Sequence, residues 1–399
     1  MIEINSLDHE GRGIGKLNNK IVFVENALPS EIVDIRIINE KKNYIEANVS
    51  SYIKKSNIRI KPQCPFYEYC GGCDIMHISY SDQLKFKEDK IRNIIDKYLN
   101  KDIRVNNIVK SDTELFYRNK TTFQVKNNIG LYKKKSYEII PINKCIITNN
   151  KINDATEYLK KLDLKYINKI ICKTNGYDLM IIIETNNKDL NINPIKDIAT
   201  SIYLKIKNEY ILVYGNKNIY YTLDNYKYVV SPDSFFQVNN STCLKLYNKI
   251  KNYVGTNKNI LDLYCGTGSI GIFISEDNNV IGIEINESAI KDANINKEIN
   301  NIDNIKFICG DSGKKINNLI FNPDIIIVDP PRSGLNNETI NNILKFKAKE
   351  IIYVSCDPMT LIRDLRIFNE YYDILEITPF DMFPNTKHIE TITHLKRKM

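Results

Sequence analysis

The sequence predicts an α/β protein in which a doubly wound, mainly parallel sheet follows two β-rich parts. Short apolar segments alternate with turn-forming residues over 1–58, and short β patterns alternate with Asn and Lys turns up to residue 232. From residue 233 onward, strand and helix patterns alternate, which is typical of a parallel sheet covered by helices on both faces. The expected domains are therefore a small barrel at 1–58, a central domain at 59–232 and an α/β domain at 233–399.

The composition narrows the class of protein. Hydrophobic residues make up 43% and charged residues 26%, which is ordinary for a soluble globular chain. The formal net charge of +8 mildly favours a polyanionic partner. No apolar run approaches the roughly 18 residues that a membrane helix needs, and Met1–Asn5 has no signal-peptide pattern. We therefore expect a cytoplasmic protein without membrane contact, whose nine cysteines are reduced or metal-bound.

Residues 1–58 contain four or five short strands, which suits a compact barrel of the oligonucleotide-binding (OB) kind. Turn-forming residues separate the strands. The run Gly11-Arg12-Gly13-Ile14-Gly15 superficially matches a dinucleotide-binding loop. No crossover helix follows it, so we interpret the run as a turn.

A cluster of cysteines opens the central domain. Three thiols lie within ten residues, and a fourth candidate, Cys145, lies further on; the three are Cys64, Cys70 and Cys73. Four thiolates fit either a tetrahedral zinc ion or an iron–sulfur cluster. The five-residue spacer and the single distant fourth cysteine favour the cluster, because structural zinc sites usually bring two close pairs. His77 stays open as a fifth donor, with a hydrogen-bonding role preferred.

Residues 81–100 predict an amphipathic helix that packs on the C-terminal domain, because apolar residues form one stripe among charged ones. Further on, aromatic residues interleave with basic ones in Tyr117-Arg118-Asn119-Lys120 and in 129–135. This pattern suits base stacking and phosphate contact, although Tyr is also a routine strand residue.

The strand Asn259–Tyr264 runs into a glycine loop that contains Gly266 and lets the backbone approach a ligand closely. Glu284 ends the next strand, 18 residues after Gly266, where a carboxylate can take both hydroxyls of a ribose. This layout serves nicotinamide dinucleotides and S-adenosylmethionine. The loop is not Gly-x-Gly-x-x-Gly, and Asp329-Pro-Pro follows, so we favour S-adenosylmethionine. Asp329 would face the transferred methyl group and Asp311 the adenine, although either carboxylate alone also suits a helix cap.

Cys356 is the candidate nucleophile. It follows the buried strand Ile351–Ser355, and Pro358 suits the first turn of a helix that continues to Asn369. We expect the helix N-terminus to lower the pKa of the thiol, at the sheet edge where α/β proteins bind ligands. A small buried residue is the alternative interpretation.

A thiolate that adds to carbon 6 of a pyrimidine makes carbon 5 nucleophilic, and a base must then remove the carbon 5 proton. Glu390 is the candidate base, because it interrupts the apolar run His388-Ile389-Glu390-Thr391-Ile392 and an isolated charge there needs a reason. A structural ion pair with Arg363 or Arg366 is the alternative.

Together these motifs resemble the 4Fe–4S-containing RNA uracil-5-methyltransferases, which make 5-methyluridine in ribosomal or transfer RNA. The resemblance covers nearly the whole chain. It implies a Rossmann-like class I methyltransferase domain, preceded by an OB-like TRAM barrel and a β-rich iron–sulfur domain. Asp357 departs from the family, which usually has Asn there, and the chain is shorter than many members.

The resemblance implies roles for individual residues. Cys356 matches the family's nucleophile and Glu390 its base. Four residues match positions that bind the methyl donor, namely Gln237 (in Phe235–Asn239), Tyr264, Glu284 and Asp329. The glycine loop and the strand tips add Gly266 and Asp311 to this set of donor-binding candidates. The remaining matches are the cluster ligands Cys64, Cys70, Cys73 and Cys145.

We expect a monomer that uses S-adenosylmethionine to methylate carbon 5 of a uridine in folded RNA, specifically 23S ribosomal RNA. The T-loop uridine of tRNA is the alternative target for the same chemistry. Two other functions stay open: a cytosine-directed methyltransferase with the same thiol addition, and a non-catalytic RNA-binding protein. The donor loop, Cys356 and Glu390 together argue against the last of these.

Overall fold

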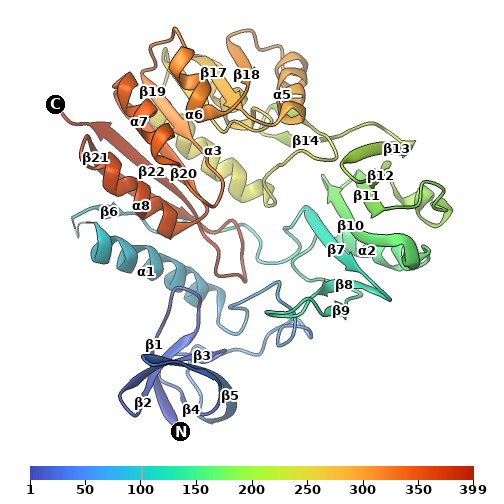
Figure 1. Ribbon diagram of the computed structural model, residues 1–399, viewed down its shortest axis with the longest axis vertical. Helices are drawn as coiled ribbons and strands as arrows, with labels where there is room; N and C mark the ends of the chain where they lie inside the picture. The colour runs from blue at the N-terminus through green and yellow to red at the C-terminus, as the bar shows by residue number, and fades with distance from the viewer. Residues whose placement is uncertain (100–101) are drawn as a thin grey trace.

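The computed structural model describes residues 1–99 and 102–399. Within these ranges the chain forms a closed barrel, a seven-stranded sheet, an eight-stranded sheet and one separate hairpin. Figure 1 shows the barrel at one end of the molecule, with the two large sheets side by side beyond it. Of the helices in the described ranges, none is long and apolar enough to cross a membrane.

The N-terminal barrel has the predicted architecture. Its strands close in the order β1-β2-β3-β5-β4; they are β1 (Ile2–Leu7), β2 (Gly13–Leu17), β3 (Lys20–Glu25), β4 (Ile32–Glu40) and β5 (Tyr44–Lys54). One prediction was wrong, because Gly13 and Gly15 belong to strand β2 and not to a turn. A Cβ on Gly15 would lie 2.7 Å from the Glu3 carbonyl oxygen, so the glycine allows close approach of two strands.

The helix predicted at residues 81–100 is α1, Tyr80–Tyr98, and residue 100 lies outside the described ranges. Ser79 caps it by accepting a hydrogen bond from the Asp82 N–H. The buried face of α1 packs on helix α8 (Pro358–Phe368) and strand β21 (Tyr372–Phe380). This helix therefore belongs physically to the C-terminal sheet, although it precedes the central sheet in the sequence.

The central sheet has the strand order β13-β12-β11-β10-β7-β8-β9. Its strands are β7 (Lys120–Val125), β8 (Ile129–Tyr132), β9 (Ile139–Pro141), β10 (Ile167–Thr174), β11 (Leu179–Thr185), β12 (Ser201–Ile206) and β13 (Glu209–Gly215). Three helical segments accompany it, namely α2 (Asn150–Leu159), η1 (Leu164–Tyr166) and η2 (Asn193–Ile198). The hairpin β14 (Ile219–Leu223) and β15 (Tyr226–Val230) leads from this sheet to the C-terminal part.

The C-terminal sheet has the order β18-β17-β16-β19-β20-β22-β21-β6, in which β22 alone runs antiparallel to both neighbours. The order reverses between β16 and β19, and ligands of such sheets bind at this switch point. The strands are β6 (Arg104–Val105), β16 (Asn259–Leu263), β17 (Asn279–Glu284), β18 (Ile305–Cys309), β19 (Ile325–Val328), β20 (Glu350–Ser355), β21 and β22 (Glu390–Arg397).

Helices cover both faces of this sheet, so the predicted doubly wound architecture is confirmed. One hydrophobic cluster joins α3, α4 and α5 to one face, and a second joins α1, α7 and α8 to the other. The alternation of Ile352 and Tyr353 between the two clusters shows that β20 is buried on both sides. The remaining helices are α3 (Asn240–Val254), α4 (Ser269–Ile274), α5 (Glu287–Ile299), α6 (Ser312–Lys315), η3 (Ile316–Asn318) and α7 (Asn337–Phe346).

Candidate active site

One cavity of about 1330 Å³ joins the carboxyl edge of the C-terminal sheet to the central sheet and the cysteine segment. Every predicted site residue except Asp311 lines it; they are Cys64, Cys70, Cys73, Cys145, Gln237, Tyr264, Gly266, Glu284, Asp329, Cys356 and Glu390. Residues that are far apart in the sequence therefore line one cavity. Asp311 instead caps helix α6, where its carboxylate accepts a hydrogen bond from the Lys314 N–H.

Strand pairing brings Cys356 and Glu390 together. Strands β20 and β22 are antiparallel, and their last registered pair is Ser355 with Thr391. One step further in the same register sets Cys356 opposite Glu390. Opposed residues of an antiparallel pair point to the same face, with Cβ atoms about 4.5–5.5 Å apart. The fold therefore holds a thiol and a carboxyl side by side at the cavity wall.

The predicted lowering of the Cys356 pKa was wrong. Burial raises the pKa of this thiol to about 11, and repulsion from Glu390 and Asp329 contributes further. The N–H groups that open helix α8 do not offset this effect, because the Asp357 carboxylate already accepts hydrogen bonds from the N–H groups of Met359 and Thr360, both at 3.0 Å.

The two carboxyl groups are also perturbed. Burial raises the pKa of Asp329 to about 7. Glu390 is 3% exposed, and burial, together with repulsion from Asp329, raises its pKa well above the usual range. Arg332 in the same cavity opposes this shift. Buried groups whose pKa values depart this far from normal are a feature of catalytic sites.

The alternative role of Glu390 as an ion-pair partner of two arginines is wrong. The Arg363 guanidinium pairs with Asp364 at 2.7 Å, and Arg366 donates to the Tyr98 carbonyl oxygen at 3.1 Å. Neither arginine lines the cavity in which the Glu390 carboxyl lies. The buried Glu390 carboxyl therefore pairs with neither Arg363 nor Arg366 and lines the cavity.

The loop after β16 is shaped by left-handed backbone conformations. Tyr264, Gly266 and Gly268 have φ values of 62°, 54° and 74°. A positive φ is uncommon at a tyrosine, and such strain concentrates at ligand sites. The Glu284 carboxylate accepts a hydrogen bond from the Gly266 N–H at 3.2 Å and one from the Asn286 N–H at 2.8 Å. The loop and the acidic strand tip therefore form one unit.

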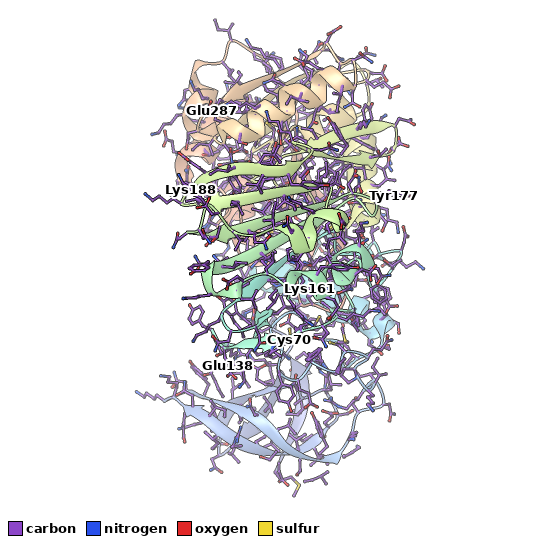
Figure 2. The ribbon with its side chains drawn as sticks, turned by 90° about the vertical axis from the view of Figure 1, so that its right-hand side faces the viewer. Cys70, Glu138, Lys161, Tyr177, Lys188 and Glu287 are labelled. Carbon is purple, nitrogen blue, oxygen red and sulfur yellow. The ribbon has the colours of Figure 1, made fainter. Side chains whose placement is uncertain are left out.

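The four cysteines converge as predicted from the motif. Cys64, Cys73 and Cys145 pack around one small core, and the Gly72 N–H lies 3.4 Å from the Cys70 sulfur. Burial raises the pKa of the Cys73 thiol, and repulsion from the other three thiols adds to the shift. Figure 2 shows Cys70 at the edge of the central sheet next to the barrel.

The four thiols are not arranged as a ready-made site for one metal ion. Among the described residues, no group of three or more His, Cys, Asp or Glu side chains is placed to hold one ion. His77 has the hydrogen-bonding role preferred from the sequence, since its Nδ1 bonds the Tyr67 hydroxyl at 2.5 Å, and it does not line the cavity that the four cysteines line. An iron–sulfur cluster needs more widely spaced thiolates, because its iron and sulfide atoms lie between them.

Sequence reasoning missed two polar residues beneath the site, Asn119 and Lys173. Both are buried and both bond the backbone of the segment that carries Gln237. The sequence signal for Lys173 is weak: it follows the apolar run Ile170-Ile171-Cys172, in a strand that also holds Asn168 and Lys169.

Comparison with known proteins places this site in a family. The model of the tRNA (uracil-5-)-methyltransferase family matches residues 176–398, and that of the TRAM domain matches 1–49. An uncharacterised RNA methyltransferase of Clostridium acetobutylicum is 35% identical, over 99% of this chain and 96% of its own length. One of Clostridium tetani is 34% identical, over 98% and 94%.

A solved structure is similar along the whole chain. It is the tRNA (uracil-54, C5)-methyltransferase of Pyrococcus abyssi in complex with S-adenosyl-L-homocysteine. Its sequence is 29% identical, the match covers 99% of each chain, and the TM-score is 0.82. Both the fold and the S-adenosylmethionine-dependent chemistry expected from the sequence are thereby supported.

Proposed function

Because the chain belongs to the tRNA (uracil-5-)-methyltransferase family, we propose that Cys356 is its nucleophile and Glu390 its proton-abstracting base. The protein is an enzyme that methylates carbon 5 of uridine in RNA, with S-adenosylmethionine as the methyl donor. The observation that carries the proposal is the β20–β22 register, which sets the two side chains opposite each other in one cavity.

In this mechanism the Cys356 sulfur bonds to carbon 6 of the uracil, and the π electrons of the ring move toward the oxygen on carbon 4. The resulting enolate makes carbon 5 nucleophilic. S-adenosylmethionine, when bound, supplies the methyl group on a positively charged sulfur. The Glu390 carboxylate then takes the proton from carbon 5, and the electron pair of that C–H bond restores the double bond between carbons 5 and 6. The bond between carbon 6 and the Cys356 sulfur breaks, and its electron pair returns to the sulfur.

The thiol proton must leave before the sulfur can add to carbon 6, and burial raises the pKa of Cys356 to about 11. A positive charge that enters the cavity stabilises the thiolate and both carboxylates. We therefore propose that a cationic donor activates the nucleophile through charge, so that an unliganded enzyme keeps its thiol protonated.

We propose that the donor is held by residues around the strained loop. Gly266 lets the backbone approach it, Glu284 faces its ribose, and Tyr264, Gln237 and Asp329 complete its walls. Asp311 lies outside the cavity lining, so we propose no direct contact for it. The chemistry of these groups fits an adenosyl amino acid, because carboxylates bind its hydroxyls and its ammonium group.

The target uridine must leave its stack to reach an enclosed thiol. We propose that the barrel and the central domain bind the surrounding RNA while the C-terminal domain receives the extruded base. Phe235 supports this division, since its ring lines the cavity and is 60% exposed. Arg118 and Lys120 on the central side of the cavity add positive charge for a phosphate.

We propose that the four cysteines hold a 4Fe–4S cluster that folds the segment between barrel and central sheet. Their convergence around one small core and their position on one cavity support this assignment. Iron and acid-labile sulfide would be assayed in protein purified without oxygen. About four of each per chain is expected, and stoichiometric zinc without sulfide would exclude the cluster.

For the target we propose a uridine of 23S ribosomal RNA. The T-loop uridine of tRNA is the second candidate, because the similar Pyrococcus abyssi protein is a tRNA (uracil-54, C5)-methyltransferase. Mapping 5-methyluridine in both RNAs of a deletion strain separates the two. Loss from 23S ribosomal RNA supports the first target, and loss from tRNA alone replaces it with the second.

The catalytic proposal is tested with Cys356→Ala and purified RNA, by mass analysis of the nucleosides. We expect 5-methyluridine with the wild type and none with the variant. Undiminished methylation by Cys356→Ala would overturn the proposal. A 5-methylcytidine product would instead assign the enzyme to cytosine.

A further inference from the structure

The segment that carries Gln237 has no regular secondary structure, so other parts of the chain must fix its position. It runs from the end of β15 to the start of α3 and forms one wall of the cavity. Phe235 and Gln237 line the cavity, while Phe236 between them is buried against the rings of Tyr221 and Tyr228. Val238 also lines the cavity, so Phe236 is the residue of Phe235–Val238 that points away from it.

Lys173 holds the first half of this segment from the central sheet. The residue lies in β10 and is 3% exposed. Its Nζ donates hydrogen bonds to the carbonyl oxygens of Ser231 and Ser234, at 2.9 and 2.7 Å. A buried ammonium is costly unless its hydrogens are satisfied, so these two bonds tie the turn and the lysine to each other.

Asp292 of helix α5 holds the same turn from the opposite side. Its carboxylate accepts hydrogen bonds from the Ser231 N–H and hydroxyl and from the Ser234 hydroxyl. Hydrogen bonds from a lysine of the central sheet and to an aspartate of the C-terminal domain therefore both hold this turn. Bonds from charged groups are the stronger class in proteins.

Asn119 holds the second half, at Gln237 itself. Its side-chain NH₂ donates to the Gln237 carbonyl oxygen and to the Asn240 side-chain oxygen, both at 2.8 Å. Its backbone N–H donates to the Val238 carbonyl oxygen at 3.0 Å. The two clamps are joined, because the N–H of Thr174, next to Lys173, donates to the Asn119 carbonyl oxygen.

We propose that Lys173 and Asn119 are positioning residues for the methyl donor: they set the backbone that presents Gln237 to it. The inference rests on the proposed role of Gln237 in donor binding. Both residues precede the stretch 176–398 that the family model matches. The donor site of the C-terminal domain is thus completed by the central sheet, and neither clamp touches the cavity where RNA and donor meet.

The test measures binding of S-adenosyl-L-homocysteine to the full-length protein by calorimetry. We expect Lys173→Met to raise Kd about tenfold, because the turn loses the two hydrogen bonds that the buried Nζ donates. Asn119→Ala should act in the same direction. The matched control is Lys169→Met, which changes a lysine of the same strand that pairs with Glu184 at 3.8 Å, away from the segment. Its Kd should stay within twofold of wild type.

A second readout separates positioning from general structural damage. We expect Lys173→Met to raise the KM for the donor and to leave kcat at saturating donor and RNA affinity within about twofold. Loss of folded protein would instead lower the number of binding sites and kcat without changing Kd. Should Lys173→Met not fold, Asn119→Ala decides, because it keeps the backbone hydrogen bonds of residue 119 to Val238 and Thr174.

An unchanged Kd in folded Asn119→Ala and Lys173→Met would overturn the inference. An equal loss of affinity for RNA and donor would also overturn it. The proposed function fails by a different result: a wild-type protein that binds the donor tightly yet leaves uridine unmethylated.

Discussion

A fully buried ion pair ties the N-terminal helix to the segment that leads into the catalytic strand. The Lys87 ammonium of α1 and the Asp381 carboxylate are both 0% exposed, with 2.5 Å between Nζ and Oδ1. Nζ also donates to the Phe383 carbonyl oxygen at 3.0 Å. Asp381 Oδ2 has no hydrogen-bond partner of normal geometry among the described residues, although burial and the nearby Asp381 carboxylate raise the pKa of Tyr80. Lys87 is thus the one ion-pair partner that the structure shows for this carboxylate.

Lys87→Met should destabilise the protein by about 3–5 kcal/mol, because it leaves a buried carboxylate uncompensated. The corresponding calorimetric transition should fall by roughly 6–20 °C for a domain of this size. The double variant Lys87→Met/Asp381→Asn removes the charge as well and should recover much of the loss. Lys85→Met, an exposed position on the same helix, should change stability by less than about 0.5 kcal/mol.

The predicted loss of stability assumes that the Asp381 carboxylate is charged and buried, and two results would contradict this assumption. A Lys87→Met protein within about 1 kcal/mol of wild type would mean that water reaches Asp381. A double variant less stable than Lys87→Met would mean that the carboxylate is stabilised by its backbone surroundings and not by the lysine. Either result would refute the account of this junction.

Two further predictions concern the donor loop and the thiol. Gly268→Ala should lower donor affinity at least tenfold, because residue 268 has a φ of 74° and a Cβ there would collide with the Phe307 ring. The affinity is measured by calorimetry. Gly255→Ala is the control and should keep its affinity, because Gly255 also has a positive φ, of 64°, but a Cβ there meets open space. Alkylation of Cys356 in donor-free protein should keep accelerating above about pH 9, because its pKa is raised to about 11 and only the thiolate reacts. The alkylation rate is measured by mass analysis of the Cys356 peptide, and the exposed Cys309 serves as the control for the reagent. A rate that stops rising near about pH 8.5 would contradict the raised pKa of Cys356.

Much of the site was predictable, because its candidate catalytic and donor-binding residues lie in short motifs at the ends of strands. A strand that ends in Cys356 and an acidic residue inside an apolar strand each need a reason, and the parallel-sheet rule brings strand tips together. The same rule predicted that Glu284 and Asp329 would share an edge, and both line the cavity. Local patterns and topology were sufficient for these residues.

The rest depends on tertiary contacts that no local pattern encodes. The pKa of Cys356 was predicted in the wrong direction, because burial and two carboxylates outweigh the helix terminus. For Asp311 the sequence left a donor contact and a helix cap open, and its carboxylate caps α6. Nothing in the local sequence of Lys173 indicates that its Nζ bonds the carbonyl oxygens of the Ser231–Ser234 turn.

The central claim is that Cys356 forms a covalent bond to the uracil and Glu390 resolves it. The most direct measurement is denaturing gel analysis of Glu390→Gln incubated with S-adenosylmethionine and target RNA. We predict a denaturation-resistant protein–RNA adduct whose uridine carries the new methyl group, and no adduct with Cys356→Ala. Normal turnover by Glu390→Gln without an adduct, or an adduct that persists in Cys356→Ala, would contradict the claim.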